Sequence, residues 1–218
     1  MKKKFLIFVL TCTMFSLCMF SESITFSADR MTGSTGENSE YSKLEGNAFI
    51  KTETMEIRAD EIVLSGQDFR FITATGSIVG KSSESDFDFE CEQLEYDRET
   101  KLVILRGNVS LVDNENDVKA TAQLIEFDQN TEIANMQITV KLIQKKNVCT
   151  GAIAVYNKKE QLLELKGSPQ IQKDKDLFKA NEISMNLETE KITLDGKVRG
   201  SVTDSGENSK SEEEKKGE

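Results

Sequence analysis

Acidic side chains at alternating positions form the pattern in this sequence that most resembles a metal site. The four acids are Asp86, Asp88, Glu90 and Glu92. Carboxylate oxygens that converge from one face of a strand are ligands that Ca²⁺ prefers. The positions between these acids hold aromatic or apolar residues, so the same acids also fit the solvent-exposed face of an amphipathic strand. The regular alternation favours the strand face, and we expect no metal site here.

Two cysteines, Cys91 and Cys149, offer a second kind of chemistry, because such a pair can form a disulfide in an oxidising compartment. They lie two units apart in the repeat described below. With strands spaced about 4.8 Å apart, two steps separate them by about 9.6 Å. A disulfide needs Cα atoms within about 7 Å of each other. The spacing therefore favours two buried thiols.

The composition excludes several classes of function. The 218 residues include no histidine, so a Ser/His/Asp or Cys/His catalytic arrangement cannot form, and a catalytic zinc site would lack its commonest ligand. The formal net charge of -10 opposes binding to nucleic acid or to an anionic membrane surface. We expect neither an enzyme nor a nucleic-acid-binding protein, and the sequence indicates no catalytic residue and no cofactor.

The N-terminal end has the pattern of an export signal. A short basic stretch precedes an apolar run over residues 5–20, and small residues suited to cleavage follow over residues 21–28. The run is shorter than the roughly 20 residues of a membrane span. We interpret residues 1–27 as a signal peptide whose cleavage site is open.

Two alternatives exist for that segment: it is retained as a membrane anchor, or the chain is lipidated at Cys12 or Cys18. The other end, residues 204–218, contains no apolar residue and is predicted to be a disordered acidic tail. One domain over residues 28–203 remains between the two ends.

Two sets of short motifs recur about every 30 residues, and they are the main evidence for the fold. One set consists of glycines within an apolar alternation: Gly46, Gly76, Gly107, Gly167 and Gly196, with Met136-Gln137 where a glycine is missing. The other consists of a small residue and its neighbour: Ala28-Asp29, Ala59-Asp60, Cys91-Glu92, Ala122-Gln123, Gly151-Ala152 and Ala180-Asn181. Because both sets have the same period, we predict six tandem units.

Each unit reads as about two β-strands. Apolar residues alternate with polar ones, as at Met55, Ile57 and Ala59, and the alternation then slips by one residue to continue at Ile62. A slip of one residue would turn every later side chain to the other face, so the chain must bend at the small residue. We predict an all-β fold in which two facing antiparallel sheets share one apolar interior.

Three segments resemble the signature of the OstA/LptA family: Ile24 to Met31, Leu44 to Ile50, and Ile57 to Ile62. They carry an Ala-Asp motif, then a Gly-Asn motif, then Ala-Asp again, and the resemblance extends over residues 24–203. It implies a β-jellyroll, or β-taco, with an apolar groove that is open at both ends. It also implies a periplasmic protein that binds lipopolysaccharide or a related glycolipid, stacks end to end, and meets LptC-like or LptD-like partners in the cell envelope.

The inward alternation also gives candidates for the groove lining. They are Ile50, Ile57, Phe87, Phe89, Leu105, Ile138, Phe178 and Leu194. Plain core packing is the alternative for each of them. Two further functions stay open for the whole chain, namely a structural β-repeat scaffold with a closed core, and an LptC-like component anchored in the inner membrane.

Overall fold

The computed structural model describes residues 23–36 and 39–203, so the predicted tail and most of the predicted signal peptide lie outside the described residues. The only helix in these ranges is η1 (Gln67–Phe69), and no helix there has the length and hydropathy to span a membrane. Everything else that is regular is strand. The strands are β1 (Thr25–Ser27), β2 (Arg30–Gly36), β3 (Ser39–Lys51), β4 (Met55–Ser65), β5 (Phe71–Ser82), β6 (Phe87–Asp97), β7 (Leu102–Asp113), β8 (Val118–Asp128), β9 (Ile133–Gln144), β10 (Asn147–Asn157), β11 (Leu162–Lys166), β12 (Gln170–Lys173), β13 (Asp176–Lys179), β14 (Glu182–Asn186), β15 (Ile192–Asp195) and β16 (Arg199–Ser201).

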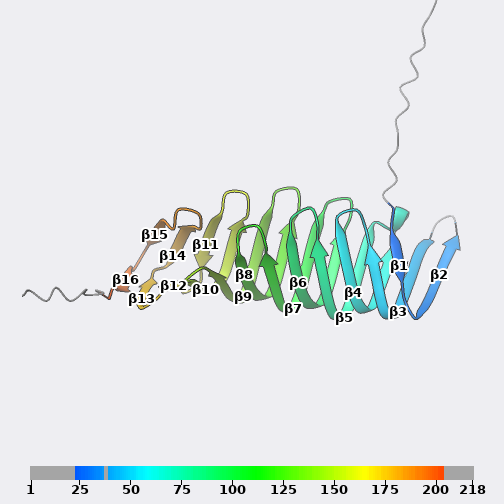
Figure 1. Cartoon of the computed structure of the whole chain (residues 1–218), viewed down its shortest axis with the longest axis horizontal. Coiled ribbons are helices and arrows are strands. Elements are labelled where there is room, and N and C mark those ends of the chain that lie inside the picture. The colour runs from blue at the N-terminus through cyan, green and yellow to red at the C-terminus, as the bar shows by residue number, and fades with distance from the viewer. Residues whose placement is uncertain (1–22, 37–38, 204–218) are drawn as a thin grey trace, which may run out of the picture.

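The strands form a single antiparallel sheet in which β3 to β10 follow one another in sequence order (Figure 1). Each of these long strands bends near its middle, so the sheet folds over on itself. The two facing sheets that we predicted are thus the two walls of one hydrogen-bonded sheet. The all-β antiparallel prediction is confirmed.

Short strands extend each wall separately at the two ends of the stack. At one end, β1 pairs with the second half of β3 and β2 with its first half. At the other end, β12 pairs with the first half of β10 and β11 with its second half. The first wall therefore includes β1, β12, β13 and β16, and the second wall includes β2, β11, β14 and β15.

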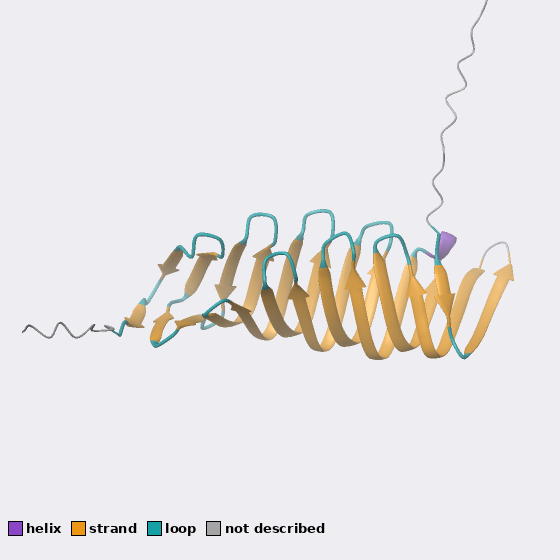
Figure 2. Cartoon of the chain, viewed as in Figure 1, coloured by secondary structure: helices purple, strands orange, loops and turns teal. Residues whose placement is uncertain are grey.

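The bends lie together along one edge of the molecule, and the hairpin turns lie along the opposite edge (Figure 2). The turns form two rims, because alternate turns belong to different walls. The first rim carries the turns at residues 52–54, 83–86, 114–117 and 145–146, and the second rim carries those at 66–70, 98–101, 129–132, 158–161 and 187–191. We call the space between the rims the mouth.

The two motif sets of the repeat meet at the bends, which we call corners. At the third corner, Gly107 and Asn108 have φ of 77° and 45°, and the pairing register shifts between Arg106 and Val109. Two residues then stand opposite one, as in a bulge that begins with a left-handed glycine. Asn108 Nδ2 donates a hydrogen bond of 2.6 Å to Glu92 Oε1 on the neighbouring strand. Asn47 binds Asp29 in the same way at 2.8 Å.

One corner differs from the sequence prediction. The bend falls at Ile138 and Thr139, which have φ of 66° and 57°, and not at Met136-Gln137. Met136 continues the inward row opposite Ile125 and is fully buried, so it cannot occupy the bend. Ile138 is consequently 59% exposed. Its predicted place in the groove lining is wrong, because the corner turns its side chain to the outside.

Apolar side chains from both walls fill the interior. Phe87, near the first rim, and Phe127, near the second rim, meet edge to face with ring centroids 4.7 Å apart. Edge-to-face contacts between aromatic rings add about 0.5–1.5 kcal/mol to the gain from burial alone. The walls are therefore in direct contact, and the interior is one packed cluster.

Candidate lipid-binding site

Seven of the eight predicted lining residues face the interior. Ile50, Ile57, Phe87, Phe89 and Leu105 are at most 4% exposed. Phe178 is half-buried and pairs across strands with the buried Ile171, and half-buried Leu194 pairs with the buried Ile183. Directly paired residues share a face of the sheet, so these two side chains also point inward. Whether acyl chains contact any of the seven stays a prediction.

The ring of Phe89 packs over a glycine on the neighbouring strand. It stands opposite Gly80, and a Cβ at Gly80 would lie 2.1 Å from the ring of Phe89. The ring thus lies across the bare backbone of Gly80. On the adjacent position of the same strand, Val79 points outward and is exposed. Phe89 and Val79 thus lie on neighbouring strands of one wall, with Phe89 facing inward and Val79 facing outward, and the two can be compared by substitution.

The interior becomes polar towards the mouth. Buried polar side chains on the first rim side are Thr52, Ser82, Ser85, Asp113, Gln144 and Asn147, and those on the second rim side are Ser42, Gln129 and Lys158. An apolar base below a polar upper margin matches the two parts of an amphiphile, whose tails avoid water and whose headgroup does not.

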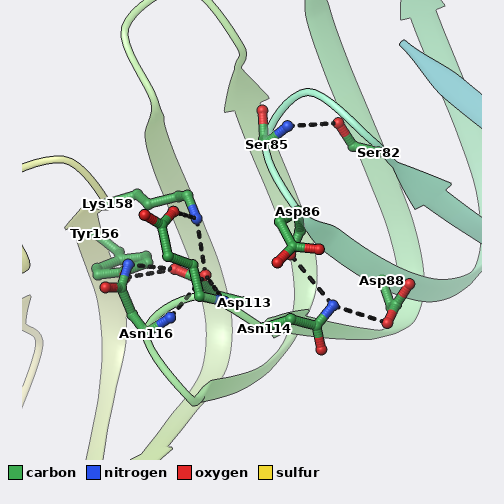
Figure 3. Close-up of polar contacts among 10 residues, drawn as sticks. Ser82, Ser85, Asp86, Asp88, Asp113, Asn114, Asn116, Tyr156 and Lys158 are labelled. Carbon is green, nitrogen blue, oxygen red and sulfur yellow. Dashed lines mark hydrogen bonds and ion pairs between the residues drawn. The ribbon is translucent and has the colours of Figure 1, made fainter.

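A buried ion pair connects the rims at the centre of the mouth (Figure 3). Lys158 Nζ donates to Asp113 Oδ1 at 2.9 Å and to Glu115 Oε2 at 2.6 Å. The hydroxyl of Tyr156 donates to Asp113 Oδ2 at 2.8 Å. The side chains of Lys158 and Asp113 are only 3% and 1% exposed, whereas that of Glu115 is 66% exposed. This group is the most buried set of charges in the described residues.

The local pKa shifts follow from this burial. Burial alone lowers the pKa of Lys158, but its hydrogen bonds to Glu115 and Asp113 outweigh that effect and raise the pKa above the ordinary lysine value. Burial, and then the hydrogen bond to Asp113, raise the pKa of Tyr156. Lys158 therefore stays charged and Tyr156 stays protonated at neutral pH. The ammonium also lies 5.1 Å from the ring centroid of Phe87.

Weaker polar contacts continue this connection along the mouth. Gln129 Nε2 donates to Ser82 Oγ at 3.2 Å, and the hydroxyls of Thr54 and Tyr96 lie 3.3 Å apart. Towards the C-terminal end, Glu190 on the second rim binds Lys145 at 3.6 Å and also binds Lys173. We call the residues that join the two rims the polar seam; they are Thr54, Ser82, Tyr96, Asp113, Glu115, Asn116, Gln129, Lys145, Tyr156, Lys158, Lys173 and Glu190.

Comparison with protein families identifies the chain. A model described as LptA/(LptD N-terminal domain) LPS transport protein matches residues 25–161 and, in a second overlapping match, residues 90–191. The chain belongs to this family. Its members are transport proteins and not enzymes.

A solved structure shows the same LptA-like fold. LptH from Pseudomonas aeruginosa, described as the LptA-homologous periplasmic component of the conserved lipopolysaccharide transport device, is 13% identical with a TM-score of 0.51. The match covers 96% of LptH but 55% of this chain. The strands of this chain therefore extend beyond the part that matches the solved LptH chain. A search of curated protein sequences finds no match.

The two cysteines within the described residues of this LptA-family chain are buried, as predicted. Cys91 and Cys149 are both free thiols, and burial raises the pKa of each to about 12. The thiolate is the reactive form, so neither cysteine is reactive at neutral pH.

The row of four acids lies on the outer face of the first wall and its edges. Asn114 donates to Asp88 Oδ2 at 2.9 Å and to the backbone oxygen of Asp86 (Figure 3), and Glu92 accepts the corner hydrogen bond from Asn108. In the ranges that the structure describes, no group of three or more acids or cysteines could hold a metal ion. Structural contacts account for the carboxylates of Asp88 and Glu92, and those of Asp86 and Glu90 belong to exposed residues.

Proposed function

We propose that the protein is a periplasmic carrier of lipopolysaccharide, or of a related glycolipid, that holds acyl chains between the two walls of its sheet. The observation that carries this proposal is the continuous apolar interior, which extends from Leu44 to Leu187 in a chain of the LptA family. Each methylene removed from water contributes about 0.8 kcal/mol. A chain of a dozen methylenes would thus contribute on the order of 9 kcal/mol before ordering costs.

The proposal requires the walls to move apart, because side chains fill the interior without a ligand. The contact between Phe87 and Phe127 must give way, since it spans the walls beneath the mouth. Acyl chains would then replace one set of apolar contacts with another. The apolar contacts between the acyl chains and the walls therefore offset the free-energy cost of separating the walls.

Both ends of the stack have strand edges to which strands of another protein could be added. One edge each of β1, β2, β15 and β16 has no neighbouring strand among residues 23–36 and 39–203. Phe26 and Met31 are exposed at one end, and Val198 and Val202 are exposed at the other. We propose that these edges pair with further copies end to end, or with LptC-like and LptD-like partners. Removal of a signal peptide before Thr25 would keep β1 for such pairing.

Two alternative functions make different predictions. A structural scaffold with a closed core is favoured by the packed interior, and it would never hold lipid. An LptC-like component anchored in the inner membrane would retain the apolar run 5–20, which lies outside the described residues. N-terminal sequencing of the mature protein separates this second alternative from an exported carrier.

Native mass spectrometry of the gently purified domain tests the carrier. We expect a retained acylated glycolipid with the wild type and with Val79→Glu, which places a charge on the outer face. Phe89→Glu, on the inner face of the adjacent strand, should lose the lipid while circular dichroism still reports a β-rich fold. A wild type without lipid, or a folded Phe89→Glu variant that retains it, would favour the scaffold.

A further inference from the structure

We infer that the polar seam is a gate along the mouth, with Lys158 as its principal latch, through which acyl chains enter the interior from the side. This inference rests on the proposed function. Corners close the opposite edge of the stack, because each strand from β3 to β10 runs from one wall into the other there and pairs with its neighbours on both sides of the bend. Only side chains connect the two rims in the contacts that define the seam, so the mouth can open without breaking the sheet.

Polar contacts suit a gate because water can replace them. When the rims separate, Lys158, Asp113 and Tyr156 exchange hydrogen bonds with each other for hydrogen bonds with water, and the net cost is small compared with that of exposing apolar surface. An apolar seam would have no such substitute and would stay closed. The position of these polar links at the one edge without corners is therefore what a gate requires.

Unpartnered polar atoms beside the seam also favour opening. Gln144 Oε1 and both side-chain polar atoms of Asn147 are buried on the first rim without a hydrogen-bond partner, and so is Gln129 Oε1 on the second rim. A buried polar atom without a partner destabilises the state that buries it. Opening gives these amides water or a lipid headgroup as partners, so it relieves a cost that the closed state carries.

Lys158 is the strongest link because it connects three elements. It is the only buried lysine or arginine in the described residues, and it binds both Asp113, at the end of β7, and Glu115, in the first-rim turn. Its ammonium also lies over Phe87, one of the two rings through which the walls touch. Movement of Lys158 thus frees both the polar seam and the aromatic contact beneath it.

Uptake of a dansyl-labelled fatty acid, followed by stopped-flow fluorescence, tests the gate in the mature chain. Lys158→Met keeps the apolar stem but leaves Asp113 without its cation, and we expect uptake to be about tenfold faster or more, the equivalent of about 1.4 kcal/mol. Asp113→Leu combined with Lys158→Met makes the seam apolar and should return uptake to the wild-type rate or slower. Thermal unfolding in parallel identifies any variant that is merely unfolded.

Milder variants and a matched control keep the test decisive if Lys158→Met does not fold. Tyr156→Phe removes the hydroxyl that links the rims through Asp113 and Asn116, and Glu115→Gln removes one of the two negative charges that face Lys158. For each variant we expect uptake to be about two- to fivefold faster, as loss of a hydrogen bond of about 1 kcal/mol allows. Lys146→Met removes an exposed ion pair with Asp174 within the first rim, and uptake should not change.

The outcomes separate the gate from the carrier. Equal uptake rates for the wild type and every folded latch variant, with lipid bound in all, would refute the gate and leave the carrier intact. A wild type that takes up no fatty acid even after long incubation would refute the carrier and the gate together. Faster uptake in the latch variants alone supports both.

Discussion

The corners and the polar seam close opposite edges of the same interior in different ways. A corner joins residues 16 to 18 positions apart, such as Glu92 with Asn108 and Asp29 with Asn47, and similar residue types recur from unit to unit. Apart from Lys173 and Glu190, which are 17 positions apart, the seam joins residues 40 to 47 positions apart. Its chemistry changes from hydroxyls to amides to ions along the mouth. The difference indicates that the corners are a permanent part of the fold and that the seam is an adjustable one.

The largest effect should follow from breaking a corner. Gly107 has φ of 77°, and a Cβ there would lie 2.5 Å from Glu92 Oε2. We expect Gly107→Val to lower the free energy of unfolding by about 3 kcal/mol or more, because it adds left-handed strain to a clash. Urea unfolding measures this change. Gly200→Ala, at the exposed end of the stack, should change it by less than about 0.5 kcal/mol.

Breaking the seam should cost less than breaking a corner. Lys158→Met combined with Asp113→Leu removes the buried ion pair without leaving one of its charges buried alone, and we expect a loss of at most about 2 kcal/mol in the free energy of unfolding. Lys146→Met, the exposed control, should cost less than about 0.5 kcal/mol. A seam variant that proves as damaging as Gly107→Val would show that the mouth is as permanent as the corners.

At the irregular corner, which bends at Ile138 without a glycine, a substitution should stabilise the fold and not destabilise it. Ile138 is β-branched, has φ of 66° and is mostly exposed. We expect Ile138→Gly to raise the free energy of unfolding by about 1 kcal/mol, since glycine adopts this conformation without strain. Ile153→Gly, at an exposed position within β10, should instead lower it by about 0.5–1 kcal/mol. A loss of stability in Ile138→Gly would contradict the strain at this corner.

The smallest effect concerns an ion pair that stays within one rim. Hydrogen bonds from Arg70 lower the pKa of Asp97 to about 2. A depressed carboxyl pKa stabilises the fold above the unfolded value near 4, and this contribution is lost as the pH falls towards about 2. Because Arg70 is partly exposed, we expect less than about 1 kcal/mol. The difference in unfolding free energy between the wild type and Asp97→Asn should shrink over that pH range; an unchanged difference would contradict the shift.

The sequence predicted the corners well because their cause is local. Each corner needs a glycine with positive φ and a small residue opposite it, as at Gly107 with Cys91-Glu92. Both residue types therefore recur at a regular interval in the sequence. The same reasoning failed at Ile138, because nothing in the residue types reveals which position bends when the glycine is absent. The strand edges near Thr25 also overlapped the predicted signal peptide, whose end the pattern of small residues did not fix.

The seam could not have been predicted in the same way. Its partners lie about one and a half units apart and depend on how far the two walls are displaced along the stack, which the pattern of one strand does not encode. Lys158 reads as an ordinary turn lysine next to Lys159 and Glu160. Lys158 becomes buried and binds Asp113 only because the two rims face each other in the folded structure.

The central claim is that acyl chains occupy the space between the walls, and photo-crosslinking tests it most directly. A fatty acid with a photoreactive group at its chain end should label inward residues such as Leu105 and Phe89 in the wild type, with sites mapped by mass spectrometry. Labels confined to outward positions such as Val79 would contradict the claim, because they would place the hydrocarbon on the outside of a sheet that stays closed.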